Sequence, residues 1–418
     1  MRAVFGTLLT LAVISTAQAE MSSSVDLSDP MSRAGSGTSW LPDTSPIYAH
    51  MLMLDSGMLM LHGTIFPRYT HIGGSRDVSA SGDGGKTKFD APSMFMAMFS
   101  TSLTDESQLG LHVMASLDPL IEGSEGYPLL YQSGETHAGV ALHDRQHPHD
   151  FISELSATYS HSIGETQSVY LYVGYPGEPA LGPPAFMHRP SAMDGPDAPI
   201  GHHWQDATHI SWGVTTLGYS FGQWKVEASA FRGREPDEQR YNFEPARLDS
   251  WSTRLSWNPT DELATQISYG ALHGPETLEP DVNLRRTTAS LLWNVPVSGD
   301  AAWSGSLVFG RNELDHEGTS DAWLLENAYR WSVHTLYSRL ERVEKSAHEL
   351  VLAGNTVYPV KTASLGYVHD LLHEENLDVG IGGQISLGTN TDDLASVYGG
   401  TSHWGAQVFL RIRPSKLE

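Results

Sequence analysis

The sequence predicts an all-β protein, a closed, antiparallel, up-and-down transmembrane β-barrel of about sixteen strands. Two observations predict this fold. Segments of about ten to fifteen residues alternate apolar and polar side chains, and the connections between these segments are alternately short and long. The start of the chain, which reads as a secretory signal peptide, agrees with it.

The alternation is clearest near the C-terminus. Trp404, Val408 and Leu410 fall on one face of an extended chain, and Gln407 and Arg411 fall on the other. Because successive side chains of a strand point to opposite faces, one face suits lipid and the other suits water. Half-buried strands of a soluble sandwich alternate in the same way, so no single segment decides between the two folds.

The lengths of the connections favour the barrel. Both termini of such a barrel lie in the periplasm, with short turns on that side and long loops outside. The short connections in this chain follow the even-numbered strands, as that arrangement requires. A total of fourteen or eighteen strands stays open, but we place sixteen. Their ranges are 58–72, 92–103, 107–118, 150–161, 166–176, 207–221, 224–233, 248–259, 263–273, 282–296, 301–313, 319–331, 335–346, 359–373, 377–389 and 402–414.

Four regions follow one another along the chain. Residues 1–19 combine Arg2, an apolar run and the small-residue pattern Ala17-Gln18-Ala19, as a cleavable secretory signal peptide does. Residues 20–46 are rich in Ser, Asp, Gly and Pro, and we expect a flexible periplasmic tail. Residues 47–57 form either a short helix or a strand that plugs the lower lumen. Residues 58–414 make the barrel, whose long outer loops we expect to fold into the lumen.

The composition limits location and partners. The chain has no cysteine and carries a net charge of −24 at pH 7. Such acidity argues against nucleic-acid binding, and an acidic mouth would gather small cations, although solvation of long loops explains the charge equally well. We expect an integral protein of the Gram-negative outer membrane, in contact with its lipid and inserted by the outer-membrane assembly machinery. The oligomeric state stays open.

Methionine and histidine alternate with apolar residues on the first three predicted strands. If the more apolar face meets lipid, these side chains form one inward patch of thioethers and imidazoles, which suit Cu(I) and, for imidazole, Cu(II) and Zn(II). Methionine also serves as adaptable packing, so this patch is either a metal site or a core. Its members are Met58, Met60, His62, Met94, Met96, Met98, His112 and Met114.

A second group of candidate ligands gathers in three outer loops. Histidines with carboxylate partners are what Zn(II) or Cu(II) requires. The candidate metal ligands are His147, His149, Asp150, His202, His203, Asp206 and His209. On an extended segment His202 and His203 would face opposite ways, so only one of them would bind. The alternative is a structural, ion-paired network that holds the loops inward and includes His188, Arg234, Glu235, Asp237 and Glu238.

Charged residues also fall on or near the polar faces of the strands. Both signs occur, which favours lateral ion pairs with a structural role over a selectivity filter of one sign. These residues are Lys225, Glu227, Arg254, Arg286, Arg311, Glu326, Arg330, Arg339, Glu341, Arg411 and Arg413.

Four stretches carry a resemblance to a known group of proteins. They are His147-Pro148-His149-Asp150, residues 201–210, residues 233–238 and Asp249-Ser250-Trp251-Ser252-Thr253-Arg254. From about residue 58 onward the chain resembles an uncharacterised family of bacterial outer-membrane barrel proteins. The resemblance implies a barrel fold and an association with copper and heavy-metal resistance determinants. It assigns no catalytic residue.

The predicted function is passage or binding of a small solute, with metal ions, copper first, as the favoured cargo. No cofactor is certain, and Cu or Zn is the candidate. The alternative is a structural or adhesive surface protein with a closed lumen. A metalloenzyme sited in the lumen is a third class, which would need a bound metal with one open coordination position; no catalytic residue is predicted.

Overall fold

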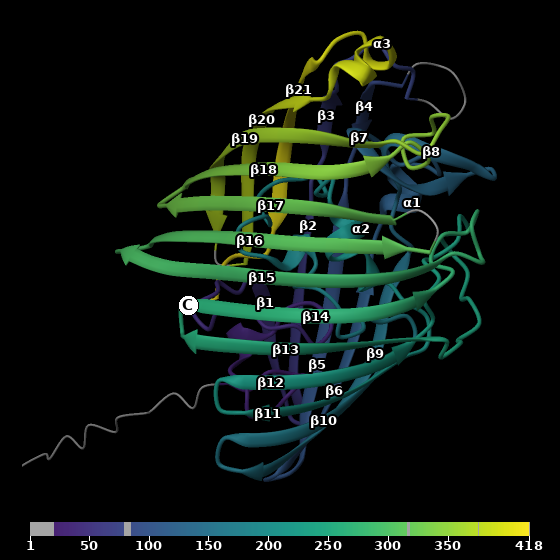
Figure 1. Ribbon diagram of the computed structural model, residues 1–418. Coiled ribbons are helices and arrows are strands. Elements are labelled where there is room, and N and C mark those ends of the chain that lie inside the picture. Colours follow the sequence, from purple (N-terminus) through teal and green to yellow (C-terminus); the bar gives the residue numbers. More distant parts are fainter. Residues whose placement is uncertain (1–20, 79–84, 316–317, 375, 418) are drawn as a thin grey trace, which may run out of the picture.

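The computed structural model describes residues 21–78, 85–315, 318–374 and 376–417, so the expected signal peptide lies outside the described residues. Sixteen antiparallel strands run side by side around a closed barrel (Figure 1). The strands are β2 (Gly57–Ile65) with its continuation β3 (Arg68–His71), β4 (Thr87–Asp90) continuing into β5 (Ser93–Thr104), β6 (Ser107–Ala115), β9 (Ile152–Gly164), β10 (Gln167–Gly174), β11 (Val214–Phe221), β12 (Trp224–Phe231), β13 (Ser250–Thr260), β14 (Leu263–His273), β15 (Asn283–Ser298), β16 (Ala301–Leu314), β17 (Gly318–Trp331), β18 (His334–Ser346), β19 (Val357–Glu374), β20 (Leu377–Thr389) and β21 (Ser402–Arg413).

The barrel closes between its last and first strands. β21 pairs with β3 from Ala406 to Phe409 and with β2 at Ile65 alone. Pro67 separates β2 from β3, and Pro92 separates β4 from β5, because proline has no N–H for the ladder. The predicted fold and the number of strands are confirmed. The sixth predicted strand began too early, since residues 207–213 belong to a buried loop and the strand starts at Val214.

The faces of the strands are also as predicted. The side chains of Trp404 and Val408 on β21 are 64% and 62% exposed, whereas those of Gln407, Phe409 and Arg411, on the other face, are buried in the lumen. Exposed tryptophans flank the apolar band at both ends, as in membrane barrels. Trp224, Trp257 and Trp303 lie near the short turns, and Trp251, Trp323 and Trp404 lie toward the long loops. Within the described residues, no helix is long and apolar enough to cross a membrane.

The N-terminal region differs from the prediction. Residues 21–46, here called the N-terminal segment, were expected to be a flexible tail but lie in the lumen, with one helical turn, η1 (Met31–Arg33). Asp26 accepts hydrogen bonds from Ser168 of β10 and Ser220 of β11 at 2.6 to 2.7 Å. The Ser-, Asp- and Gly-rich composition that resembles disorder supplies hydrogen bonds to the polar inner wall. Residues 47–57 contain a strand, β1 (Ala49–Leu54), which pairs with β2 in the wall and does not plug the lumen.

Long outer loops fill the rest of the lumen, as expected. The connection from β10 to β11, residues 175–213, is here called the inner loop and contains η2 (Phe186–His188), α2 (His202–Gln205) and η3 (Ala207–His209). Figure 1 shows α2 within the barrel. The connection from β6 to β9 contains α1 (Asp118–Ile121) and the hairpin of β7 (Tyr127–His137) and β8 (Val140–Gln146). The connection from β20 to β21 contains η4 (Asp392–Leu394) and α3 (Ala395–Tyr398).

Buried ion pairs attach the inner loop to the wall. Asp194 pairs with Arg330, Arg411 and Arg413. Burial alone would raise the pKa of the Asp194 carboxyl, but these three guanidinium groups outweigh it and hold that pKa below its ordinary value. Of the charged residues predicted to face inward, Arg311 does not, because its side chain is 51% exposed and pairs with Asp321 on the outer surface.

Substituting Asp194→Asn tests this attachment. Removing one partner leaves buried guanidinium groups without compensation, which costs about 3 to 5 kcal/mol in other proteins. We expect the variant to unfold at lower denaturant concentration and its inner loop to become sensitive to protease. Asp321→Asn removes a carboxylate from an exposed ion pair and serves as the matched control. Equal stability of the two variants would contradict the anchoring role.

Candidate metal centre

Five histidines from two loops form a closed ring inside the outer half of the barrel. Around the ring each histidine is next to two others, in the order His202, His203, His147, His149 and His209, and His209 is again next to His202. Their ring centroids are 5.0 to 6.2 Å apart. This group, here called the histidine ring, consists of His147, His149, His202, His203 and His209, all of them predicted as metal ligands.

Hydrogen bonds assign the protonated nitrogen in four of these imidazoles. Nδ1 of His149 and His202 each faces a carboxylate oxygen, at 2.8 Å from Asp118 and 2.6 Å from Asp206. Nδ1 of His209 faces the carbonyl of Asp206 at 2.9 Å, and Nδ1 of His147 faces that of Pro148 at 3.1 Å. Since these oxygens only accept, each Nδ1 carries the proton and each Nε2 keeps its lone pair.

In three of the five ring histidines the Nε2 atom is buried and has no hydrogen-bond partner among the described residues. These histidines are His149, His203 and His209. An unsatisfied buried polar atom costs about 1 to 3 kcal/mol. A carboxylate or carbonyl on one imidazole nitrogen with the other left open is the arrangement that orients histidine toward a metal ion.

Burial also keeps three of the ring's imidazoles in the neutral form that can bind a metal ion. Desolvation lowers the pKa of His209 well below its ordinary value, and the nearby imidazoles of His202 and His149 lower it further. Desolvation likewise lowers the pKa of His147 and of His202, the latter in spite of the Asp206 carboxylate. These imidazoles are therefore uncharged at neutral pH and have lone pairs to offer.

The inner loop positions two adjacent histidines by forming a helical turn at α2. Trp204 anchors this turn, since its indole Nε1 donates to Ser320 at 2.9 Å and its ring is fully buried. The backbone of Trp204 lies so close to β16 that a Cβ on Gly310 would come within 2.2 Å of its carbonyl oxygen. Because the segment is helical and not extended, His202 and His203 both border the ring, which corrects the expectation that they would face opposite ways.

Asp206 was predicted as a metal ligand, but its carboxylate is engaged by His202 and Arg189, and it orients the ring instead. Its carboxylate accepts from His202 and, at 2.6 Å, from Arg189, which also donates to Glu326 of β17. Burial would raise the pKa of Asp206, but Arg189 and the imidazoles hold it below its ordinary value. This buried chain of charges joins the ring to the wall of the barrel.

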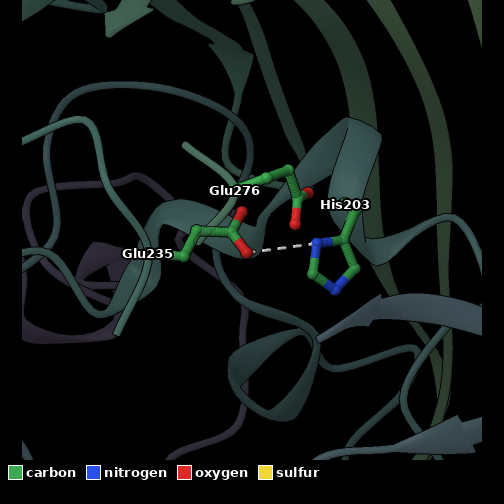
Figure 2. Close-up of side chains that lie close together, drawn as sticks. All are labelled: His203, Glu235 and Glu276. Carbon is green, nitrogen blue, oxygen red and sulfur yellow. Dashed lines mark ion pairs between the residues drawn. The ribbon is translucent and has the colours of Figure 1, made fainter. Parts of the chain in front are cut away.

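A group of one histidine and two glutamates lies at the outer side of the ring. Figure 2 shows Glu235 and Glu276 directed toward His203, whose Nδ1 lies 3.3 Å from Glu235 Oε2. Over the described parts of the chain, this is the one group of three such side chains whose ligand atoms all lie within 4.8 Å of one another. His203, Glu235 and Glu276 are here called the mouth triad, because they line a cavity between the outer loops. Imidazole with carboxylates suits a divalent transition-metal ion.

Other predicted site residues lie elsewhere. Asp150 pairs with Arg240, Asp237 accepts hydrogen bonds from its own loop, and Glu238 caps the β7–β8 hairpin at Gly139. Arg234 is half-buried in the outer loop that also carries Asp237 and Glu238. His188, expected at the rim, lies deeper in the lumen and lines a cavity among methionines.

The predicted thioether and imidazole patch does form on the inner wall. Met60, Met94, Met96 and Met98 line a cavity together with His62, whose Nε2 is 3.0 Å from Met98 Sδ. Three predicted members do not line it. Met58 is buried beside it, Met114 packs against its wall, and His112 makes a hydrogen bond to Ser24 of the N-terminal segment at 2.7 Å.

Sequence reasoning missed several residues of both regions. Asp118, which orients His149, is the last residue of a predicted strand and is far from His149 in the sequence, and Glu276 belongs to a loop that carries no other candidate. Met31, Met187 and Met193 complete the methionine-lined cavity from segments that were expected elsewhere or were not considered. No spacing in the sequence relates these residues to the ones they meet.

Comparisons with known proteins bear on the fold. No protein-family model matches the chain, and no curated protein sequence matches it. Among solved structures, the chain is similar to Salmonella typhi OmpF (TM-score 0.53, 10% identity, 87% of this chain and 100% of that chain). It is also similar to Pseudomonas putida OprB (0.51, 11%, 87% and 95%) and to an anion-selective porin from Comamonas acidovorans (0.50, 14%, 85% and 99%). The fold is therefore that of outer-membrane porins.

The substitution Asp118→Asn tests the orientation of the ring. The amide would keep an oxygen for the backbone N–H of Ser93 but turn a donor toward His149, whose proton would then move to Nε2. Losing such an orienting group lowers metal affinity by about 10- to 100-fold in other sites. We expect the affinity of the variant for Zn(II), measured by titration calorimetry in detergent, to fall by that factor. Asp237→Asn, a carboxylate of a neighbouring loop, should bind as the unaltered protein does, and an equal affinity of both variants would refute the assignment.

Proposed function

We propose that this protein is an outer-membrane porin-like barrel that takes a transition-metal cation, copper first, into its lumen. One observation carries the proposal. Three buried imidazoles of the histidine ring, those of His149, His202 and His209, have Nδ1 turned to an oxygen acceptor, which leaves the Nε2 lone pairs for a ligand. A network that only held the loops together would use both nitrogens. Three of the ring's Nε2 atoms lack any partner among the described residues.

A route through the lumen follows from the positions of the ligands. An ion would meet the mouth triad first, and His203 belongs to both the triad and the ring. On the far side of the ring, a cavity is lined by His149, Asp118, Met94, Met187 and Met193. Its wall shares Met94, Met187 and Met193 with the methionine-lined cavity below. The ligands thus change from carboxylate and imidazole to thioether along the route.

The ring offers an ion several neighbouring positions. A Zn(II) or Cu(II) ion binds imidazole nitrogens at about 2.0 to 2.1 Å, and ring centroids 5.0 to 6.2 Å apart allow two neighbouring imidazoles to reach one ion. Because every histidine of the ring has two such neighbours, an ion can pass from one pair to the next, as conduction through several sites of moderate affinity requires. A catalytic zinc site has three protein ligands and one open position; a ring of five favours a function other than catalysis.

A structural surface protein with a closed lumen is the second candidate. The N-terminal segment and the inner loop fill the barrel, and buried ion pairs fix the inner loop to the wall. A scaffold of this kind would show no conductance and no metal flux. Planar-bilayer recordings and metal flux into liposomes containing the protein and a metal-sensitive dye separate the two candidates.

Alanine at His149, His202, His203 and His209 tests the proposal. We expect the unaltered protein to bind Cu(II) or Zn(II) and carry it into liposomes, and the variant to lose both abilities because the Nε2 ligands are gone. Metal content of the purified protein and dye fluorescence are the measurements. His209→Gln alone, with a milder expected loss, is the substitution to use if the fourfold variant does not fold.

His373→Ala is the matched control, since that side chain is 64% exposed and remote from the ring in the sequence and in its contacts. It should bind and transport as the unaltered protein does. Near-zero copper and zinc in the unaltered protein, or equal metal in the ring variant, would remove the proposal.

A further inference from the structure

A cavity lined by sulfur lies below the histidine ring. Seven of the thirteen methionines of the chain border it, together with two histidines. They come from four places: β2, β5, the inner loop and the N-terminal segment. The group, here called the methionine cavity, consists of Met31, Met60, His62, Met94, Met96, Met98, Met187, His188 and Met193.

One of its two imidazoles is turned toward a sulfur atom, and the other has an unpartnered buried nitrogen. Nε2 of His62 lies 3.0 Å from Met98 Sδ. Nε2 of His188 is buried, and within the described residues no group makes a hydrogen bond to it. Burial lowers the pKa of His188 to about 4, so its ring is neutral at neutral pH. Methionine used only as packing would not need an unpaired nitrogen beside it.

The walls of the methionine cavity carry no carboxylate among the described residues. The charged side chain that borders it is Arg413, whose guanidinium lies over the ring of Tyr48 and donates to Asp194. Burying an ion without a counter-charge is costly, and the cost rises steeply with its charge. A divalent ion is therefore disfavoured here, in contrast to the mouth triad with its two glutamates.

Neutral thioethers and imidazoles are the ligands that soft monovalent ions prefer. We propose that the methionine cavity is a second, separate site, selective for soft monovalent cations such as Cu(I) and Ag(I). The inference rests on the proposed function in one respect, namely that ions reach the cavity past the histidine ring. The site itself consists of other residues and can be tested alone.

Silver(I) is the probe, because it mimics Cu(I) and needs no reductant. The full-length protein in detergent is titrated with Ag(I) by calorimetry, beside a variant with Met60→Leu, Met96→Leu and Met98→Leu. Leucine fills nearly the same volume without sulfur, so the barrel should fold. We expect the affinity for Ag(I) to fall about 100-fold while the affinity for Zn(II) stays unchanged. X-ray absorption of the silver complex should show sulfur neighbours that the variant lacks.

Two comparisons complete the test. Met53→Leu changes a methionine that is 71% exposed and should leave Ag(I) binding intact. The fourfold alanine variant of the histidine ring should lose Zn(II) but still bind Ag(I) in detergent, which separates failure of this site from failure of the proposed function. Unchanged Ag(I) affinity in the leucine variant, or Zn(II) binding that competes with Ag(I), would overturn the inference.

Discussion

Compensation of charge inside the barrel is the constraint on which the rest of the structure depends. Arg254 of β13, Arg330 of β17 and Arg411 of β21 point into a lumen that contains protein and not bulk water. Each must meet an opposite charge there, because an unpaired buried ion is costly. Glu227 of β12 compensates Arg254, and Asp194 of the inner loop compensates the other two. The inner loop is therefore part of the wall's electrostatics, and the imidazoles that it carries are held at fixed positions.

The arrangement of the histidine ring follows from that attachment. Arg189 links Asp206 to Glu326 of β17, and Asp206 in turn orients His202 and His209. Asp118 orients His149 from a different loop. Two independent attachments thus turn their imidazoles toward one space. Such support from outer neighbours is what keeps a set of ligands aligned before an ion arrives.

The sequence predicted the wall well and the interior only in part. Alternation with period two identifies strands and their faces, so Met96 and Met98 were correctly placed on the inner face of β5. The interior of a filled barrel has no such period. Trp212 and Asp194 are buried in an irregular loop, and the polar N-terminal segment looks disordered until a polar wall surrounds it. The five ring histidines were found because they cluster in two short stretches. Asp118 and Met187 were missed because tertiary contacts alone relate them to the site.

The junction where the sheet closes has an uneven strength. β21 is registered with β20 along twelve pairs, but with the first strand through four pairs at β3 and one at β2. Pro67, which has no N–H, removes a further donor beside β21. If the barrel opened sideways, this junction would separate first and would expose β3 and the end of the methionine-bearing strand β2 at the new edge.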